Sequence, residues 1–235
     1  MGADFRREHH QVIAEILERF DPEFLACAGI GFGGGTRIAM EIDEYRESTD
    51  IDFICPTTDS YRAVREIVSN VGLGRMLRSP LDLAREIRVD RYGARTAIRH
   101  GGHTIKMEIL SFDDWNIQVV SHPLFPVPVL DQSACFATKL TATNDRGFVA
   151  PYKDVFDLLA MRAYWGEIPA SAIAEAERHY GRSVMSVAER AIAQFLALPE
   201  TARRNAAESL GIEADFLDRI IADRVRNTDR SLSPE

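Results

Sequence analysis

The chain has 235 residues, enough for one sizeable domain or for a domain with a helical appendage. Hydrophobic residues make up 46% and charged residues 27%, as in ordinary globular proteins, and no apolar run approaches the roughly 20 residues of a membrane span. The net charge of −8 argues against broad, charge-driven binding to nucleic acid or to an anionic membrane.

We expect no membrane association and a cytoplasmic location. The first ten residues, MGADFRREHH, lack the apolar stretch of a secretory signal. The cysteines Cys27, Cys55 and Cys135 are widely spaced and form no C-x-x-C pair, which argues against both a disulfide framework and a zinc site.

The first quarter of the chain is predicted to mix helices and strands. Helical spacing of apolar residues over 5–20 predicts a first helix. The short apolar run at 24–30 predicts a strand that enters a glycine-rich turn. A helix is expected over 36–45 and a second strand over 50–55.

Strand-like runs follow in the middle of the chain. After a helix predicted over 61–71, residues alternate in the manner of strands at 83–91, 95–100 and 104–110, with glycine turns between them. From residue 131 onward helical spacing dominates.

The fold expected from this order is α+β. A small mixed β-sheet core with helices is predicted over residues 1–130. A helical C-terminal region over 131–226 is expected to complete the active-site cleft, and 227–235 is expected to be a polar tail.

The most informative stretch is a glycine turn followed by two acids. Gly34, Gly35 and Thr36 offer backbone N–H groups that can approach phosphate oxygens closely, because glycine lacks a Cβ. Asp50 and Asp52 alternate with apolar residues, so both carboxylates project from one strand face. Mg²⁺ suits such oxygen ligands and completes its shell with water and phosphates. The stretch therefore predicts metal-assisted chemistry on a nucleoside triphosphate.

Glu108 is the predicted third acid. Two-metal phosphoryl transfer commonly needs a further carboxylate, and Glu108 shares the polar face of its predicted strand with Lys106. Asp90, in an earlier strand-like run, is the rival candidate. A solvent-facing acid without a role is the alternative for Glu108.

Two polar stripes are expected on the later helices. Lys139 and Arg146 share one helix face, and Asp154 and Asp157 share a face of the next helix. The cations could hold phosphates by charge-assisted hydrogen bonds, with the two acids orienting them. A solvated helix face is the alternative, because charges at this spacing usually occupy one.

Cations gather in one segment of this acidic chain. Residues 75–106 predict a surface that faces a polyanion, and charges that only solvate the outer faces of strands are the alternative. The cations are Arg75, Arg78, Arg85, Arg88, Arg91, Arg95, Arg99 and Lys106, against the acids Asp82, Glu86 and Asp90.

A dinucleotide-binding site is a competing interpretation of the glycines. The run from Gly29 to Gly34 satisfies G-x-G-x-x-G, with Asp50 about 20 residues further on. A Rossmann fold, however, needs successive right-handed β-α-β crossovers, whereas the later strands here come as adjacent hairpin-like runs. A Walker A site is excluded because no lysine follows the glycines.

With these features the chain resembles the AbiEii/AbiGii-type nucleotidyltransferase toxin family of the DNA polymerase β nucleotidyltransferase superfamily. The resemblance rests on a glycine turn, an R-x-S-x-D-h-D-h block and a late K-L-x-A…R…[RK]-D-x-x-D-L block, in that order. Here they read Gly34-Gly35-Thr36, Arg46-x-Ser48-x-Asp50-Ile51-Asp52-Phe53 and Lys139-Leu140-x-Ala142…Arg146…Lys153-Asp154-x-x-Asp157-Leu158.

The resemblance implies a toxin that transfers a nucleoside monophosphate from an NTP to an acceptor, which in some members is tRNA or another RNA. It also implies Mg²⁺ or Mn²⁺ at the acids and a cognate antitoxin protein. We predict catalytic roles for Asp50, Asp52, Glu108, Lys139 and Asp157, metal binding by Asp50, Asp52 and Glu108, and nucleotide contacts from Gly34, Gly35, Thr36, Arg46, Ser48, Arg146 and Asp154.

Three alternatives to this function stay open. One is a dinucleotide-binding oxidoreductase, and another is a non-catalytic nucleotide-binding module that keeps the fold. The third is nucleotidyl transfer to a small cationic acceptor of the aminoglycoside type, which the net charge of −8 favours.

Overall fold

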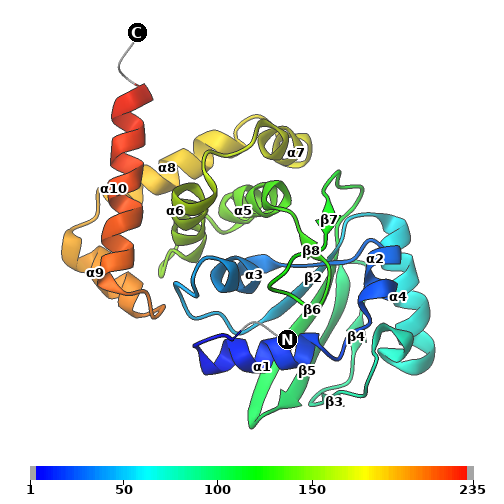
Figure 1. The fold of residues 1–235 in the computed structure, drawn as a ribbon. Helices are drawn as coiled ribbons and strands as arrows, with labels where there is room; N and C mark the ends of the chain where they lie inside the picture. The colour runs from blue at the N-terminus through cyan, green and yellow to red at the C-terminus, as the bar shows by residue number, and fades with distance from the viewer. Residues whose placement is uncertain (1–3, 232–235) are drawn as a thin grey trace. The chain divides into compact units, whose positions relative to one another are not determined.

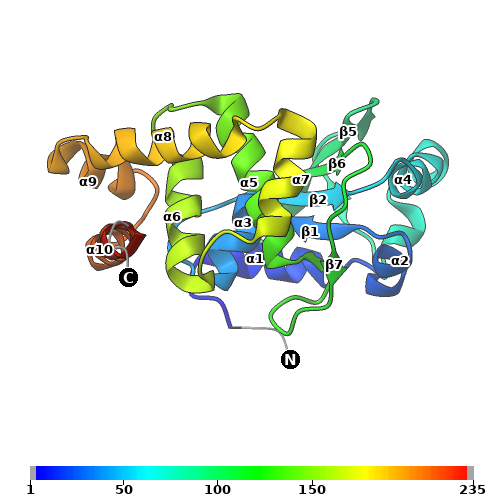
Figure 2. The ribbon, with the colours of Figure 1, turned by 90° about the horizontal axis from the view of Figure 1, so that it is seen from above.

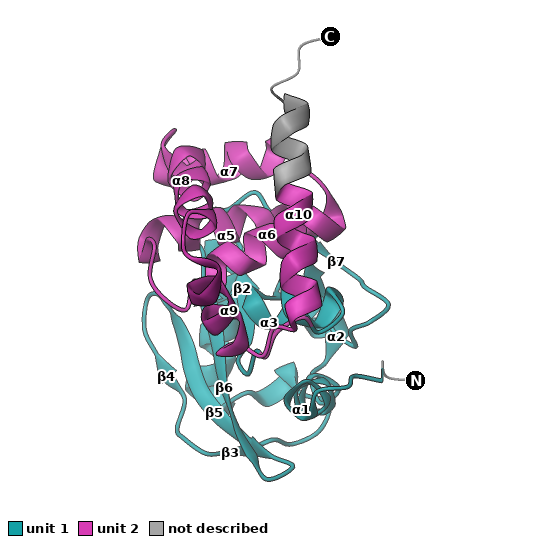
Figure 3. Ribbon diagram, turned by 90° about the vertical axis from the view of Figure 1, so that its left-hand side faces the viewer, with its two compact units in different colours: residues 1–44, 48–131 teal, residues 45–47, 132–235 magenta. Residues whose placement is uncertain are grey.

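The computed structural model describes residues 4–231, with side chains described up to residue 224. The chain divides into two compact units, a sheet unit of residues 1–44 and 48–131 and a helical unit of residues 45–47 and 132–235 (Figure 3). None of the helices in the described range is both long and apolar enough to cross a membrane.

The sheet unit begins with helices and short strands (Figure 1). Its first elements are α1 (Glu8–Leu17), α2 (Pro22–Cys27), β1 (Gly31–Gly33), α3 (Gly34–Glu41), β2 (Ile51–Cys55), α4 (Thr58–Val71) and the 3-10 helix η1 (Gly74–Met76). The remaining strands are β3 (Asp82–Leu83), β4 (Arg88–Val89), β5 (Gly93–His100), β6 (His103–Ser111), β7 (Val119–Val120) and β8 (Val129–Leu130).

These strands form one mixed sheet in the order β3-β5-β6-β2-β1-β8-β7, with β4 also paired to β5. The register places Asp52 between Gly33 on antiparallel β1 and Glu108 on parallel β6. Further out, Glu108 pairs with Arg95 on β5, and Arg95 pairs with Arg88 on β4. Because directly paired residues present their side chains on the same sheet face, Asp52, Glu108, Arg95 and Arg88 form a row across four strands.

The opposite sheet face carries the hydrophobic core. Phe53 of β2 and Ile109 of β6 are completely buried there, together with Phe32 of β1. Ile13 and Ile16 of α1 fill the same core. Burial of each such side chain is worth about 1.5–3 kcal/mol, so this packing determines which face of β2 is left for the acids.

The predicted strand at 24–30 is wrong, because α2 occupies most of that range. Asp21 caps this helix by accepting hydrogen bonds from the backbone N–H groups two and three residues later, at 2.9 and 3.2 Å. Pro22 stands at the first helical position, where its missing N–H costs nothing. The strand is formed instead by β1, which contains two of the glycines themselves.

The other elements of the sheet unit follow the predicted order with shifted bounds. The run at 83–91 is only partly extended, as the two-residue strands β3 and β4. α4 begins three residues before its predicted start because Thr57 and Ser60 form a capping box. The strand predicted over 50–55 is confirmed, and its apolar residues Ile51 and Phe53 face the core.

The helical unit confirms the helical spacing from residue 131 onward. It consists of α5 (Gln132–Arg146), α6 (Lys153–Trp165), α7 (Ala170–Tyr180), α8 (Val184–Leu196), α9 (Glu200–Glu208) and α10 (Ala214–Ser231). α5 packs against α6, α7 and α8, and α10 packs against α6 and α9 (Figure 2). The tail predicted for 227–235 lies partly outside the described residues, since α10 continues to Ser231 and 232–235 are not described.

Candidate active site

Gly34 brings the glycine turn against Asp52. Its φ is +70°, and a Cβ built at this position would lie 2.2 Å from Oδ2 of Asp52. Glycine is therefore required here for two reasons. Residues with a side chain rarely adopt this positive φ, and the carboxylate of Asp52 fills the space that a side chain would take. The glycine turn and one of the three predicted metal-binding acids thus lie together.

Two predicted nucleotide-binding hydroxyls also lie side by side. Thr36 Oγ1 and Ser48 Oγ are 2.8 Å apart. Thr36 is buried and lies with Gly35 in the first turn of α3, whereas Ser48 stands two residues before Asp50. This hydrogen bond ties the segment that leads into the acids to the helix that follows the glycines.

Lys106 lies among the acids of this sheet face. Its Nζ donates to Oε2 of Glu108 at 2.6 Å. Burial alone would lower the pKa of Lys106, but Glu108 and, more weakly, Asp50 and Asp52 raise it above its usual value. Sequence reasoning placed Lys106 on this face and counted it among the cations of a polyanion-facing surface, but gave it no part in the nucleotide site. Its position two residues before Glu108 was the available signal.

Glu108 pairs with Asp52 in the strand register, but its carboxylate is held by two cations. Arg95 Nε donates to Oε1 of Glu108 at 2.9 Å, and Lys106 binds the other oxygen. Asp90, the rival third acid, binds Nη1 of Arg95 at 2.9 Å and accepts backbone hydrogen bonds from the turn that follows it. Arg95 therefore connects the two candidates.

The donors on this face fit Mg²⁺ or Mn²⁺ through two carboxylates. Asp50 and Asp52 would offer two carboxylates to such an ion, and Mg²⁺ is usually bound by one or two carboxylates together with substrate phosphates and water. Among the residues that the structure describes, no three His, Cys, Asp or Glu side chains are grouped closely enough to hold a metal ion. Glu108, the predicted third ligand, is instead engaged by Arg95 and Lys106.

In the helical unit, five predicted site residues form one charge network. Lys139 Nζ lies 2.9 Å from Oδ1 of Asp154 and 2.5 Å from Oδ2 of Asp157. Arg146 Nη1 binds both oxygens of Asp154, at 3.2 and 3.0 Å. Arg46 donates two hydrogen bonds to Asp157, from Nε to Oδ1 at 2.7 Å and from Nη2 to Oδ2 at 3.0 Å. The two polar stripes therefore meet each other.

Burial and charge compete in this network. Burial alone would raise the pKa of Asp157, but Arg46 and Lys139 hold it well below its usual range. The hydroxyl of Tyr45 donates to Asp157, and burial together with that carboxylate raises the pKa of Tyr45 well above its usual value. Lys139 and Asp157 are both buried, so a solvated helix face is excluded for them.

One hollow in the helical unit adjoins this network. It has a volume of about 330 Å³ and lies at the loop between α5 and α6. Its lining includes the predicted nucleotide-binding residues Arg146 and Asp154, together with Lys153, Val149 and Tyr152. Arg146 is the exposed member of the network, with 61% of its side chain accessible.

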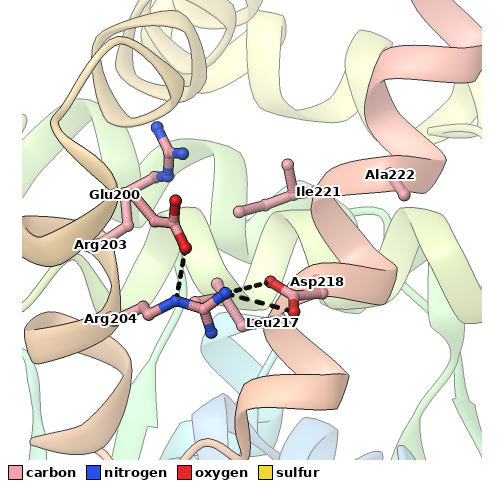
Figure 4. Close-up of a pocket in the computed structure, with 7 residues that line it drawn as sticks. All are labelled: Glu200, Arg203, Arg204, Leu217, Asp218, Ile221 and Ala222. Carbon is pink, nitrogen blue, oxygen red and sulfur yellow. Dashed lines mark hydrogen bonds and ion pairs between the residues drawn. The ribbon is translucent and has the colours of Figure 1, made fainter.

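Another hollow, of about 270 Å³, lies between α9 and α10 (Figure 4). Arg204 there donates to Glu200 at 2.8 Å and binds Asp218 at 3.2 Å. Leu217 and Ile221 contribute apolar side chains to its wall. Arg203, also in the lining, donates to the backbone carbonyls of Leu196 and Leu198, and none of the lining residues is a predicted site residue.

The glycines do not form a dinucleotide-binding turn. A helix, α2, rather than a strand leads toward them, and they occupy β1 and the first turn of α3. The next strand, β2, runs antiparallel to β1, whereas a Rossmann unit requires a parallel strand at this point. The oxidoreductase interpretation therefore lacks the fold that it needs.

Known proteins were compared with the whole chain. A family model described as the nucleotidyl transferase AbiEii toxin of a type IV toxin–antitoxin system matches residues 15–225. A crystal structure of a protein from Helicobacter pylori, provisionally assigned as a nucleotidyltransferase, matches with a TM-score of 0.51 and 16% identity, over 97% of each chain. The crystal structure of JHP933 from Helicobacter pylori has a TM-score of 0.47 and 15% identity, over 98% of this chain and 100% of that chain. No curated protein matches the sequence.

These findings agree with the architecture. At 16% identity the first structural likeness supports the fold alone, and it confirms the predicted α+β fold class. The family match covers the glycine turn, both acids and the late Lys139 to Asp157 block. The chain belongs to the AbiEii family of nucleotidyltransferase toxins of type IV toxin–antitoxin systems.

Proposed function

We propose that this chain transfers a nucleoside monophosphate from an NTP to an RNA acceptor, with a divalent metal ion held by Asp50 and Asp52. The observation that carries the proposal is the close approach of Gly34 to Asp52, with 2.2 Å between a built Cβ and the carboxylate oxygen. This closeness supports the proposal, because the turn that would bind phosphate lies beside an acid that would bind the metal ion. Family membership supports the reaction class.

The glycine turn would hold the triphosphate. The first backbone N–H groups of α3 have no partner within the helix and carry its positive dipole end, so they favour phosphate oxygens. The hydroxyls of Thr36 and Ser48 add polar hydrogens beside this turn. Lys106 supplies a positive charge on the face of the two acids.

The reaction exchanges one phosphorus–oxygen bond for another. The acceptor hydroxyl oxygen bonds to the α-phosphorus, the bond from that phosphorus to the bridging oxygen breaks, and pyrophosphate leaves. The hydroxyl proton passes to a carboxylate of the site or to water. A bound Mg²⁺ supplies neutralisation of the charge on the phosphate oxygens. Lys106 and Arg95 add fixed positive charge on the same sheet face.

The network of the helical unit would have a divided role. Arg46 and Lys139 both bind the buried Asp157, so we assign these three residues to holding the helical unit in its conformation rather than to contacting the substrate. Arg146 is exposed beside the 330 Å³ hollow and can contact a phosphate without uncovering the buried pair. A cognate antitoxin protein follows from the type IV family, and we expect a neighbouring reading frame to encode it.

The test replaces Asp52 with asparagine, which keeps the shape of the side chain and removes its charge. Wild-type protein should incorporate labelled NTP into total RNA in a metal-dependent manner, and Asp52→Asn should lower the rate at least about a hundredfold. The matched control is Asp59→Asn, an exposed acid of α4 whose partner is Arg62, which should retain the activity. Transfer at the wild-type rate by Asp52→Asn would refute the proposal, provided that both variants melt like the wild type.

A binding measurement separates the open alternatives. Fluorescence titration should show binding of ATP with Mg²⁺ and weak or no binding of NADH. A preference for NADH would favour the dinucleotide-binding oxidoreductase over the nucleotidyltransferase. Nucleotide binding without any transfer, to RNA or to an aminoglycoside, would identify a non-catalytic module.

A further inference from the structure

A row of arginines continues from the acids to the edge of the sheet. Asp52 pairs with Glu108, Glu108 with Arg95 and Arg95 with Arg88, so their side chains share one face. Three strand spacings of about 4.8 Å place Arg88 roughly 14 Å from Asp52. The row is acidic at β2 and basic at β4.

Two arginines lie at the outer edge of the sheet without a neutralising partner among the described residues: Arg88, which ends this row, and Arg91, which follows β4. Arg95 is matched by Asp90 and Glu108. In the described part of the chain, by contrast, neither Arg88 nor Arg91 forms an ion pair, and both side chains are exposed. A protein of net charge −8 repels polyanions over most of its surface, so an uncompensated basic edge attracts them locally.

The neighbouring aromatic residue points to nucleic acid rather than to an acidic protein. Tyr92 is 57% exposed, and the guanidinium of Arg91 lies over its ring at 4.4 Å from the centroid. Exposed aromatic rings and guanidinium planes are the surfaces on which single-stranded bases stack. A polynucleotide also carries charges that repeat over the length of the row, which a single triphosphate does not.

We propose that Arg88 and Arg91, with Tyr92 beside them, bind the backbone and a base of the RNA whose hydroxyl reacts at Asp50 and Asp52. This inference rests on the proposed function, because it takes RNA as the acceptor. The row set by the strand register then guides the substrate from Arg88 at the β4 edge to Asp52 on β2, with Asp50 directly before that strand.

The experiment measures binding of fluorescein-labelled bulk tRNA to the full chain by anisotropy, between about 50 and 200 mM NaCl. The double variant Arg88→Ala/Arg91→Ala is compared with Arg182→Ala/Arg190→Ala. The control arginines are also exposed, form no ion pair among the described residues, and lie in the helical unit. Both double variants change the net charge equally.

The Arg88→Ala/Arg91→Ala protein, the edge variant, should bind tRNA about tenfold more weakly than the wild type. The slope of log K against log salt should become less steep by roughly 1.4–1.8, because two phosphate contacts are lost. The control should stay within about twofold of the wild type. In the transfer assay the edge variant should raise KM for tRNA while KM for NTP stays unchanged, because the glycine turn is intact.

Several results would overturn the inference. Equal weakening by both double variants would show only a net-charge effect, and unchanged binding by the edge variant would remove the site. Polyglutamate that competes as well as tRNA would show a general polyanion surface. Wild-type protein that binds no tRNA would also overturn the inference. If that protein still transferred nucleotide to another acceptor, and Asp52→Asn lost this activity, the proposed nucleotidyl transfer would stand without the RNA site.

Discussion

Replacing Asp157 with asparagine should destabilise the protein more than any surface substitution. The carboxylate is completely buried and accepts two hydrogen bonds from Arg46, at 2.7 and 3.0 Å. It also pairs with Lys139 at 2.5 Å and accepts the hydroxyl of Tyr45. The neutral side chain would leave Arg46, only 3% exposed, as a buried cation without its carboxylate.

Removing one partner of a buried ion pair typically costs about 3–5 kcal/mol, a large part of a total stability of about 5–15 kcal/mol. With an m-value of about 1–3 kcal/mol/M in urea, the midpoint should fall by about 1 M or more. Urea unfolding followed by circular dichroism measures this shift. Lys139 keeps Asp154 at 2.9 Å, which limits its share of the loss.

The control for this prediction is Asp59→Asn, in which an acid with an 84% exposed side chain loses its pairing with Arg62. Its midpoint should stay close to that of the wild type, because exposed ion pairs contribute little. An Asp157→Asn midpoint as close to the wild type as that of the control would refute the reasoning. It would mean that the buried network does not stabilise the fold.

Two further changes test the site and the network. Gly34→Ala should abolish nucleotidyl transfer, because its Cβ would lie 2.2 Å from Asp52 Oδ2. The control is Gly29→Ala, which has a similar φ of +67° but no atom within 4 Å of its Cβ, so it should lose some stability and keep the activity. Nucleotidyl transfer by Gly34→Ala would show that Asp52 need not stay in place. Acid should weaken the fold through Asp157: its pKa is depressed in the folded state, so its contribution is complete above the unfolded value near 3.9 and is lost as pH falls below about 4. The gap in urea midpoint between wild type and Asp157→Asn should therefore narrow from pH 5 to pH 2.5, and a constant gap would contradict the assignment.

The sequence alone predicted the structure correctly where the alternation of apolar and polar residues determines which strand face is buried. Ile51 and Phe53 alternate with the acids, so the buried face of β2 could be read directly, and the structure buries both. It was insufficient at α2, because a short apolar run suits a strand or a helix equally well. The cap at Asp21 and the proline after it were the better guide there.

The partners of charged residues could not be read from spacing. Lys139 and Asp157 were placed on helix faces correctly. Arg46, however, lies 111 positions from Asp157, and its place in the R-x-S-x-D-h-D-h block led to a predicted nucleotide contact. The two cations on Glu108 depend on the pairing of β5 with β6, which alternation alone does not specify.

Residues 45–47 have a consequence for dividing this protein. Tyr45 and Arg46 come from the first fifth of the sequence, yet they belong to the helical unit, where Glu47 also donates its backbone N–H to Leu210 at 2.9 Å. A fragment beginning at residue 132 would lose the Arg46 partner of Asp157. Chimaeras that join two family members near that position would mix an arginine from one parent with an aspartate from the other, and only parents that share this pairing should yield a folded hybrid.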